Sequence, residues 1–144
     1  MAAPSIERTI HIGDLDGEVD LPLDELWRLI GTAEGWSEWL VDEAELEVVQ
    51  GGVGDVVDDG VRRTVRIETA QAGVGVTFVW SSGDDTSRVT LHIDETGDGR
   101  RVLRITEEPL VACADCPLRA EAHATRWDLR ACLLCLASRA TSRV

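Results

Sequence analysis

The sequence predicts an α+β fold in which a curved antiparallel sheet packs against one long C-terminal helix. From Ala44 to Glu107, apolar and polar residues alternate with period two, and glycine-rich turns interrupt the alternation repeatedly. From Pro117 to Ala140 the chain has no glycine and no further proline, which is typical of a helix of 24 residues. Such a helix is ~36 Å long at 1.5 Å per residue, so it can cover one face of a sheet.

The first predicted elements are strand and helix segments near the N-terminus. Residues 5–21 alternate apolar and polar side chains around a glycine-aspartate turn, so they form one interrupted strand or two short strands. A short helix ends at Gly31, since a helix commonly stops at a glycine, and a second begins near Thr32. The first helix carries apolar residues at helical spacing: Leu26, Trp27, Leu29 and Ile30.

Six more strands follow, and with the first they make a sheet of about seven. The expected ranges are 44–50, 53–58, 61–70, 74–82, 86–95 and 100–107. Their apolar residues share one face: Leu46, Val48, Val65, Ile67, Val76, Phe78, Trp80, Val89, Leu91, Ile93, Leu103 and Ile105. The opposite face is polar, so we expect one face of the sheet to be covered and the other to meet solvent.

Composition bounds the class of protein. The 144 residues suffice for one domain that buries roughly two-thirds of the surface its unfolded form exposes. The formal charge of −13 repels phosphate backbones and anionic lipid, so we expect no nucleic-acid or membrane partner. All 14 basic residues are arginine, which excludes covalent chemistry that depends on lysine.

The N-terminal segment and the longest apolar run bear on location. The first residues lack the basic start, apolar core and cleavage site of a signal peptide, and Ala131–Ala137 is too short to span a bilayer. We therefore expect a cytoplasmic protein. In that compartment the four cysteines are reduced thiols or metal ligands rather than permanent disulfides.

Five parts of the chain, in their order and spacing, match one family pattern: Val19–Trp27, Gly35–Trp39, Val79–Trp80, Ser87–Leu91 and Trp127. With the order of the predicted elements, they resemble the START-like, or SRPBCC, helix-grip superfamily, and within it the branch named after the activator of heat-shock-protein-90 ATPase homologue. The resemblance covers nearly the entire chain, and the cysteines are not part of the family pattern. It implies two short helices after the first strand, a sheet wrapped around the last helix, and a cavity that in many relatives holds an apolar small molecule.

Tryptophans give the candidate binding residues, because the chain has five of them, one phenylalanine and no tyrosine. The segment Leu21–Leu40 is predicted to plug or gate the open end of the grip, with Trp27 in the core and Trp36 and Trp39 nearer the mouth. Core packing is the alternative explanation for all of these side chains. The predicted ligand-binding residues are Trp36, Trp39, Phe78, Trp80, Leu91 and Trp127.

We predict no catalytic residue, because alternation gives an inward sheet face that is almost wholly aliphatic and aromatic. His11 and His92 are expected to face solvent, and His123 near the start of the long helix has an ordinary surface or hydrogen-bonding role. By the alternation of its strand Glu107 is expected to face inward, but it is the last residue of that strand. A buried polar cluster around Trp80 and Trp127 would instead favour an enzyme.

Cysteine spacing offers a different hypothesis. Two Cys-x2-Cys pairs, separated by 15 residues, match a four-thiolate zinc site formed by Cys113, Cys116, Cys132 and Cys135. An unbroken helix from Pro117 would separate Cys116 from Cys132 by ~24 Å. One chain could then bind a single zinc only if the helix began late, near Thr125, whereas a metal between two chains escapes this limit. Thiol redox chemistry at the first pair, or simple burial of the second, are the alternatives.

Three functions follow. The leading hypothesis is a non-enzymatic domain that binds an apolar small molecule or a partner protein between sheet and helix. The alternative is a zinc- or thiol-dependent regulatory protein, and the third is a polyketide cyclase-like enzyme. No cofactor other than zinc is predicted. The apolar segment Ala131–Ala137 indicates a homodimer contact.

Overall fold

The computed structural model of the chain describes residues 6–12, 23–83, 85–95, 101–110 and 116–142. The elements are β1 (Ile6–Ile12), α1 (Leu23–Gly31), α2 (Ala33–Trp39), β2 (Glu43–Glu45), β3 (Val53–Asp58), β4 (Val61–Gln71), β5 (Gly75–Ser82), β6 (Asp85–Glu95), β7 (Arg101–Pro109) and α3 (Cys116–Ser142). None of the helices in these ranges is long and apolar enough to span a lipid bilayer.

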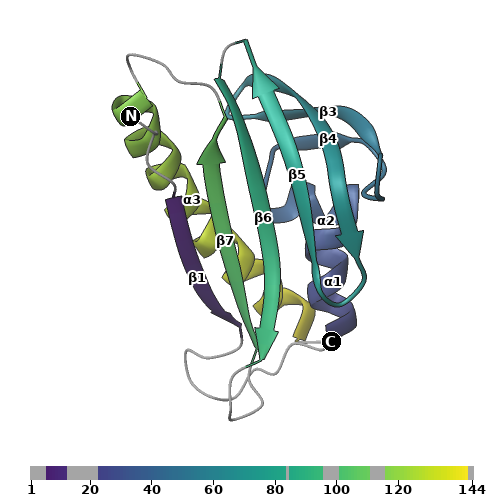
Figure 1. The fold of residues 1–144 in the computed structure, drawn as a ribbon. Helices are drawn as coiled ribbons and strands as arrows, with labels where there is room; N and C mark the ends of the chain where they lie inside the picture. Colours follow the sequence, from purple (N-terminus) through teal and green to yellow (C-terminus); the bar gives the residue numbers. More distant parts are fainter. Residues whose placement is uncertain (1–5, 13–22, 84, 96–100, 111–115, 143–144) are drawn as a thin grey trace.

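The seven strands form one antiparallel sheet in the order β1-β7-β6-β5-β4-β3-β2. Figure 1 shows the sheet as one curved layer with all three helices against the same face. The predicted α+β class, with two short helices after the first strand and one long C-terminal helix, is confirmed. Residues 13–21, the turn and second half of the strand segment predicted at 5–21, lie outside the described residues.

Helices α1 and α2 meet at a close crossing. The hydroxyl of Thr32 accepts a hydrogen bond from the Gly35 backbone N–H at 2.9 Å and so caps the start of α2. A Cβ atom on Gly35 would lie 2.0 Å from the Arg28 carbonyl oxygen, so only glycine fits there. Nearby, the indole N–H groups of Trp36 and Trp39 donate to the carbonyls of Ile30 and Leu29, each at 2.7 Å. These bonds satisfy carbonyls that the end of α1 leaves without helical partners.

The expected roles of the three N-terminal tryptophans are reversed. Trp36 and Trp39 are 0% and 1% exposed, so they belong to the core and not to a mouth. Trp27 is only partly buried and packs against that core from outside. The prediction overlooked the carbonyl groups at the end of α1, which draw the two later indoles inward.

A row of aromatic rings crosses the interior from α2 to α3. Trp36 contacts Phe78 with ring centroids 4.7 Å apart, Phe78 contacts Trp80 at 5.3 Å, and Trp80 contacts Trp127 at 6.3 Å. Each of these rings is at most 1% exposed. The row links the helix pair, the central strand β5 and the long helix into one core.

The predicted strand 44–50 is wrong in extent, because β2 ends at Glu45. Pairing with β3 stops at the partners Glu45 and Asp55. The chain then leaves the sheet edge and returns at Gly51 and Gly52, which exchange backbone hydrogen bonds with Ile67 at 2.9 and 2.8 Å. The alternation at 46–50 reflects side-chain burial in a connecting segment, of which Val48 is 7% exposed.

Candidate functional site

The inward-facing positions of the sheet become polar at one end. Successive strands run in opposite directions, so the end of β3, the start of β4, the end of β5, the start of β6 and the end of β7 lie together. We call this region the polar end of the sheet. It carries Asp58, Arg63, Asp85, Ser87 and Glu107, each on the same alternation as the core residues of its strand.

A two-residue turn sets the position of Asp58. Asp58 pairs with Val61 at the end of the β3–β4 hairpin, and the loop residues Asp59 and Gly60 have φ angles of 53° and 77°. Positive φ at both central positions is the geometry of a tight hairpin turn that matches strand twist. Asp42 accepts a hydrogen bond from the Asp59 backbone N–H at 2.8 Å. The turn thus leaves Asp58 on the inner face, 4% exposed.

Glu107 lies at the centre of the polar end and is 1% exposed. Its Oε2 atom accepts hydrogen bonds from the Trp80 indole at 2.9 Å and from the Ser87 hydroxyl. Its Oε1 atom lies 2.9 Å from both the Trp127 indole nitrogen and Nδ1 of His123. Burial raises the pKa of Glu107, but the hydrogen bond and charge of His123, with the other donors, outweigh it and bring the pKa to about 2. Glu107 is therefore a buried carboxylate anion.

His123 projects from the first half of α3 between two carboxylates. Besides Glu107, it meets Asp85, whose Oδ2 atom lies 3.2 Å from Nε2. The hydrogen bond to Glu107 raises the pKa of His123, against the effect of burial. Both ring nitrogens face carboxylate oxygens, so the doubly protonated imidazolium is the form that this environment favours.

Two arginines of α3 share Asp58. Arg126 Nη2 lies 2.9 Å from Asp58 Oδ1, and Arg130 donates to the other carboxylate oxygen. Arg130 also donates to the Leu40 carbonyl at 2.9 Å. Its guanidinium lies 4.3 Å from the ring centroid of Trp127, a cation–π distance. Burial lowers the pKa of Arg130, against the attraction of Asp58.

Arg63 differs from these two arginines because no carboxylate among the described residues accepts a hydrogen bond from its Nε or Nη1 atom. Its side chain is 11% exposed, and its guanidinium lies 4.9 Å from the ring centroid of Trp80. Its Nη1 atom is 3.6 Å from Asp85 Oδ2, which is an ion pair but longer than a hydrogen bond. Among the described residues, Nε and Nη1 have no hydrogen-bond partner although both are buried.

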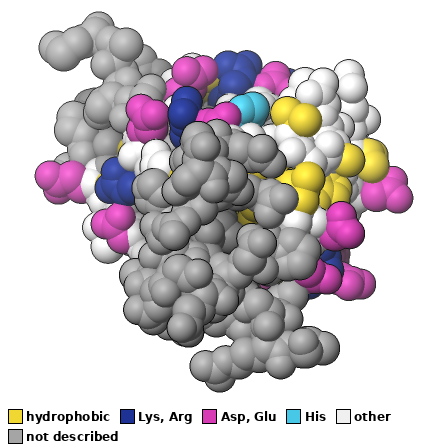
Figure 2. All heavy atoms as spheres, turned by 90° about the horizontal axis from the view of Figure 1, so that it is seen from below, with side chains coloured by type: hydrophobic (Ala, Val, Ile, Leu, Met, Phe, Trp, Pro, Cys, Tyr) yellow, Lys and Arg dark blue, Asp and Glu magenta, His cyan; other side chains and the backbone are white. Residues whose placement is uncertain are grey.

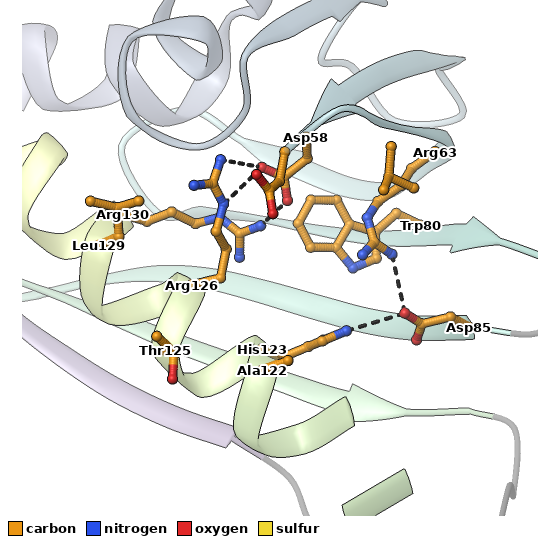
Figure 3. Close-up of a pocket in the computed structure, with 12 residues that line it drawn as sticks. Asp58, Arg63, Trp80, Asp85, Ala122, His123, Thr125, Arg126, Leu129 and Arg130 are labelled. Carbon is orange, nitrogen blue, oxygen red and sulfur yellow. Dashed lines mark hydrogen bonds and ion pairs between the residues drawn. The ribbon is translucent and has the colours of Figure 1, made fainter. Parts of the chain in front are cut away.

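The charged side chains other than Glu107 line a pocket of about 560 Å³ between the polar end of the sheet and α3. Figure 3 shows Trp80 and Arg63 on the sheet side and His123, Arg126 and Arg130 on the helix side. Val61 and Leu129, 43% and 46% exposed, also line it. The pocket therefore combines two exposed apolar side chains and one nearly buried indole with several fixed charges.

No protein-family model and no curated protein matches the chain. Among solved structures, it is similar to protein MLL2253 from Mesorhizobium loti, with a TM-score of 0.79 and 16% identity over 96% of this chain and 98% of that one. The Aha1 dimer from Colwellia psychrerythraea gives a TM-score of 0.67 and 13% identity over 91% and 92%. DynU16, from the dynemicin biosynthetic locus, gives 0.71 and 13% over 96% of this chain and 48% of its own.

These likenesses agree with the strand order and the long terminal helix. The chain has the helix-grip fold. At identities of 13–16% the similarity shows the fold and says nothing about the role of the residues at the polar end.

Within the helix-grip fold, Trp80 alone of the six predicted binding residues lines the described pocket. All six are at most 1% exposed and belong to the core, Trp80 at its border with the pocket and the other five away from it: Trp36, Trp39, Phe78, Leu91 and Trp127. The expectation of an almost wholly apolar inward face is wrong at the polar end, where Asp58, Ser87, Glu107 and Arg130 are buried. The prediction that Glu107 faces inward is confirmed, since its side chain is buried.

Sequence reasoning missed most residues of the pocket, although a signal for several was present. Arg63 shares the alternation of Val65 and Ile67, and Asp85 shares that of Val89. Extending each apolar alternation to the end of its strand would have shown polar residues gathering at one edge. On α3, His123, Arg126 and Arg130 lie near Trp127 at helical spacing, but the sequence does not say which face meets the sheet.

The cysteines are not brought together within the described chain. Helix α3 begins at Cys116 and continues to Ser142, so the late start near Thr125 does not occur. Cys116 and Cys132 are sixteen residues apart on this helix, ~24 Å along its axis, so one zinc cannot bind both within one chain. Cys113 lies outside the described residues, as do the side chains of Cys116 and Cys135.

Cys132 is exposed, against the alternative in which it is a buried apolar residue. The described residues contain no group of three or more potential metal ligands. Of the histidines, His92 lies on the outer face beside Asp94 as predicted, 43% exposed at its side chain. The side chain of His11 is outside the described residues.

Proposed function

We propose that this helix-grip chain binds a small organic molecule in the pocket between β4, β5 and α3. The observation that carries the proposal is the pocket itself, about 560 Å³ in volume and placed where the sheet and the long helix separate. Sites for small molecules are concave, have volumes of roughly 300–1,000 Å³, and combine apolar surface with a few fixed polar groups. Trp80 and the surrounding arginines and carboxylates form such a combination.

The lining changes the ligand class expected from the sequence. Nε and Nη1 of Arg63 are buried without a partner, and an unsatisfied buried donor costs about 1–3 kcal/mol, a cost that a purely apolar molecule would not relieve. A molecule with an apolar body for the exposed side chains Val61 and Leu129 and polar groups for the charges meets both needs. We therefore propose an amphipathic organic ligand, such as an aromatic molecule with polar substituents.

The test compares a filled pocket with an intact one. Ala122→Trp places a bulky ring on the pocket wall from α3, and Ala72→Trp places the same ring on the exposed turn between β4 and β5. Native mass spectrometry of each variant, purified from its host, should show a bound molecule with the wild type and with Ala72→Trp but not with Ala122→Trp. Equal retention by the two variants would place the ligand elsewhere, and an empty wild type that also ignores added aromatic probes would contradict the proposal.

A second candidate is acid–base catalysis in the same pocket. The observation that favours it is His123, which lines the pocket and lies between Glu107 and Asp85. A buried polar cluster around Trp80 and Trp127 favours an enzyme such as a polyketide cyclase. Nε2 of a protonated His123 can turn its hydrogen bond from Asp85 to the carbonyl oxygen of a substrate and protonate it as the enolate develops, while the released Asp85 carboxylate accepts the α-proton.

Exchange of protons next to a carbonyl tests this candidate without a known substrate. In D2O, wild-type protein should accelerate deuterium uptake at the α-carbon of an aryl ketone, followed by NMR, and His123→Gln should abolish the acceleration. His92→Gln removes a histidine of the outer face and serves as the control. A rate equal to buffer for the wild type would remove this candidate.

The remaining sequence hypotheses stay proposals. The solved Aha1 neighbour is a dimer, which supports a homodimer of this chain, and light scattering of the purified protein measures its mass. Membership of the branch named after the activator of heat-shock-protein-90 ATPase homologue, and a protein partner, rest on the same likeness. Zinc shared between two chains is checked by elemental analysis of the reduced protein.

A further inference from the structure

We infer that the ligand of this pocket is an organic anion, with a carboxylate or sulfonate on an apolar body, and that Arg63 binds the anionic group. This inference rests on the proposed small-molecule function and specifies its ligand class. Two features of Arg63 support it: the hydrogen bonds that its guanidinium lacks and the incomplete counter-charge around it.

Arg63 has unused hydrogen-bonding capacity. Its guanidinium lies 4.9 Å from the ring centroid of Trp80. The side chain is 11% exposed, and Nε and Nη1 are buried without a hydrogen-bond partner among the described residues. The two N–H groups point to opposite sides of the guanidinium, so a carboxylate or sulfonate that takes the place of the atoms covering one of them can accept a charge-assisted hydrogen bond from it.

The carboxylates nearby are already occupied. Glu107 accepts from Trp80, Ser87 and Trp127 and pairs with His123, and Asp58 is shared by Arg126 and Arg130. Asp85 is the nearest acid to Arg63, but it also pairs with His123 at a shorter distance, 3.2 Å against 3.6 Å. Arg63 therefore has only part of one counter-charge.

A charge balance of the buried groups around the pocket points the same way. With His123 protonated, four cationic side chains at most 22% exposed face three carboxylates at most 25% exposed, which leaves one positive charge. The cations are Arg63, His123, Arg126 and Arg130, and the carboxylates are Asp58, Asp85 and Glu107. Two more acids are exposed to solvent, where their charge is screened: Asp42, which pairs with Arg126, and Asp59, which lines the pocket.

The net charge of the chain does not favour anions. The whole chain carries a formal charge of −13. In the view of Figure 2, arginines and acidic side chains lie next to one another on the described surface instead of forming a basic patch. Binding of an anion would therefore report the local charge at Arg63 and not a general attraction.

The experiment uses two fluorescent probes that share one skeleton. 1-Anilinonaphthalene-8-sulfonate carries an anionic group, and N-phenyl-1-naphthylamine is the same molecule without it. The wild type should bind the sulfonate more tightly than the neutral probe by about ten- to a hundredfold, the range of a charge-assisted hydrogen bond. Arg63→Gln should remove this preference. Arg62→Gln, at the neighbouring outward position that is 69% exposed, should leave it unchanged.

The outcomes separate the inference from the function beneath it. Binding of neither probe, with no ligand from the host, would contradict the proposed function itself. Equal binding of both probes, or a preference that survives in Arg63→Gln, would leave a small-molecule pocket and overturn the assignment of Arg63.

A measurement on the wild type alone covers the case in which Arg63→Gln does not fold. Bound sulfonate probe should be displaced by 2-naphthoate at concentrations at least tenfold lower than by 2-naphthamide, which has nearly the same shape but no charge. Equal displacement by the acid and the amide would overturn the inference.

Discussion

The two ends of the sheet's inner face differ in composition although the same strands build both. At the polar end, buried charges meet α3 around Glu107 and Asp58. At the opposite end, which we call the apolar end, Val76, Leu91 and Leu103 are buried with the residues of α1. The alternation along each strand is continuous, so strand geometry alone does not separate the two ends.

The contrast shows how one core serves two purposes. Apolar burial stabilises a fold without requiring an exact partner for each group, by roughly 25 cal/mol per Å² removed from water. A buried charge requires specific partners, because losing one of them costs several kcal/mol. The apolar end therefore sustains the fold, and the polar end, with its pocket, carries the fixed charges on which the two proposed functions rest.

The largest effect is expected when a core ring at the helix pair is removed. Trp39→Ala should lower the free energy of unfolding by about 3–5 kcal/mol, because a fully buried ring and its hydrogen bond to Leu29 are lost. Trp27→Ala, at a partly buried ring, should cost less than half as much. Urea denaturation measures both. If the Trp39 variant keeps its stability and instead loses affinity for the aromatic probes, the residue gates the pocket after all.

The polar end should give a pH dependence that the apolar end lacks. The pKa of Glu107 is about 2 in the folded chain against 4.5 ordinarily, so its contribution, about 3 kcal/mol, is present above pH 4.5 and is lost as the pH falls toward 2. The raised pKa of His123 stabilises the fold below pH 6.5, and this contribution is lost as the pH rises through the folded pKa. Stability from this pair should therefore be greatest between pH 4.5 and 6.5.

Denaturation from pH 2 to pH 9 measures this profile. Glu107→Gln should flatten the acid limb and His123→Gln the alkaline limb. The matched control is Glu108→Gln, at the adjacent outward carboxylate that is 47% exposed, and it should leave the profile unchanged. A wild-type profile that stays flat across both limbs would mean that Glu107 and His123 are not paired in solution.

The smallest effect concerns the turn that places Asp58. Gly60 has a φ of 77°, and Gly60→Ala should lower stability by about 1 kcal/mol, because alanine is disfavoured in this region. A Cβ atom at this position meets nothing within 4 Å outside the adjacent residues, so the loss comes from the local backbone and not from a clash with the rest of the molecule. Val61→Ala, at the exposed neighbour, should cost less. An unchanged melting midpoint for Gly60→Ala would show that the turn adopts another geometry.

The sequence was a better guide to the apolar end than to the polar end. Period-two alternation and one long helix were sufficient for the fold, because burial of apolar side chains follows local pattern. The same alternation predicts that Glu107 faces inward. Its partners His123 and Trp127 lie on a helix whose orientation depends on tertiary packing, so the sequence does not predict these contacts. Arg63 was missed because an arginine near a turn is usually solvated.

The cysteine hypothesis failed in its intramolecular form for a comparable reason. Spacing along the sequence matched a zinc site, but it carries no information about where a helix begins. Because α3 is unbroken from Cys116, the fifteen residues between Cys116 and Cys132 are helical and hold the two cysteines ~24 Å apart. A local pattern can therefore suggest a metal site that continuous secondary structure forbids within one chain.

The row of rings from Trp36 to Trp127 gives the molecule an optical property. The chain contains no tyrosine, so its ultraviolet emission comes almost wholly from indoles, and neighbouring rings along the row are 4.7 to 6.3 Å apart. Excitation passes readily between indoles as close as Trp80 and Trp127, whose centroids are 6.3 Å apart. Trp80 alone of the row lines the pocket. A quencher bound there would therefore also reduce the fluorescence that follows absorption by the neighbouring indole. Intrinsic fluorescence would then report occupancy of the pocket without any added label.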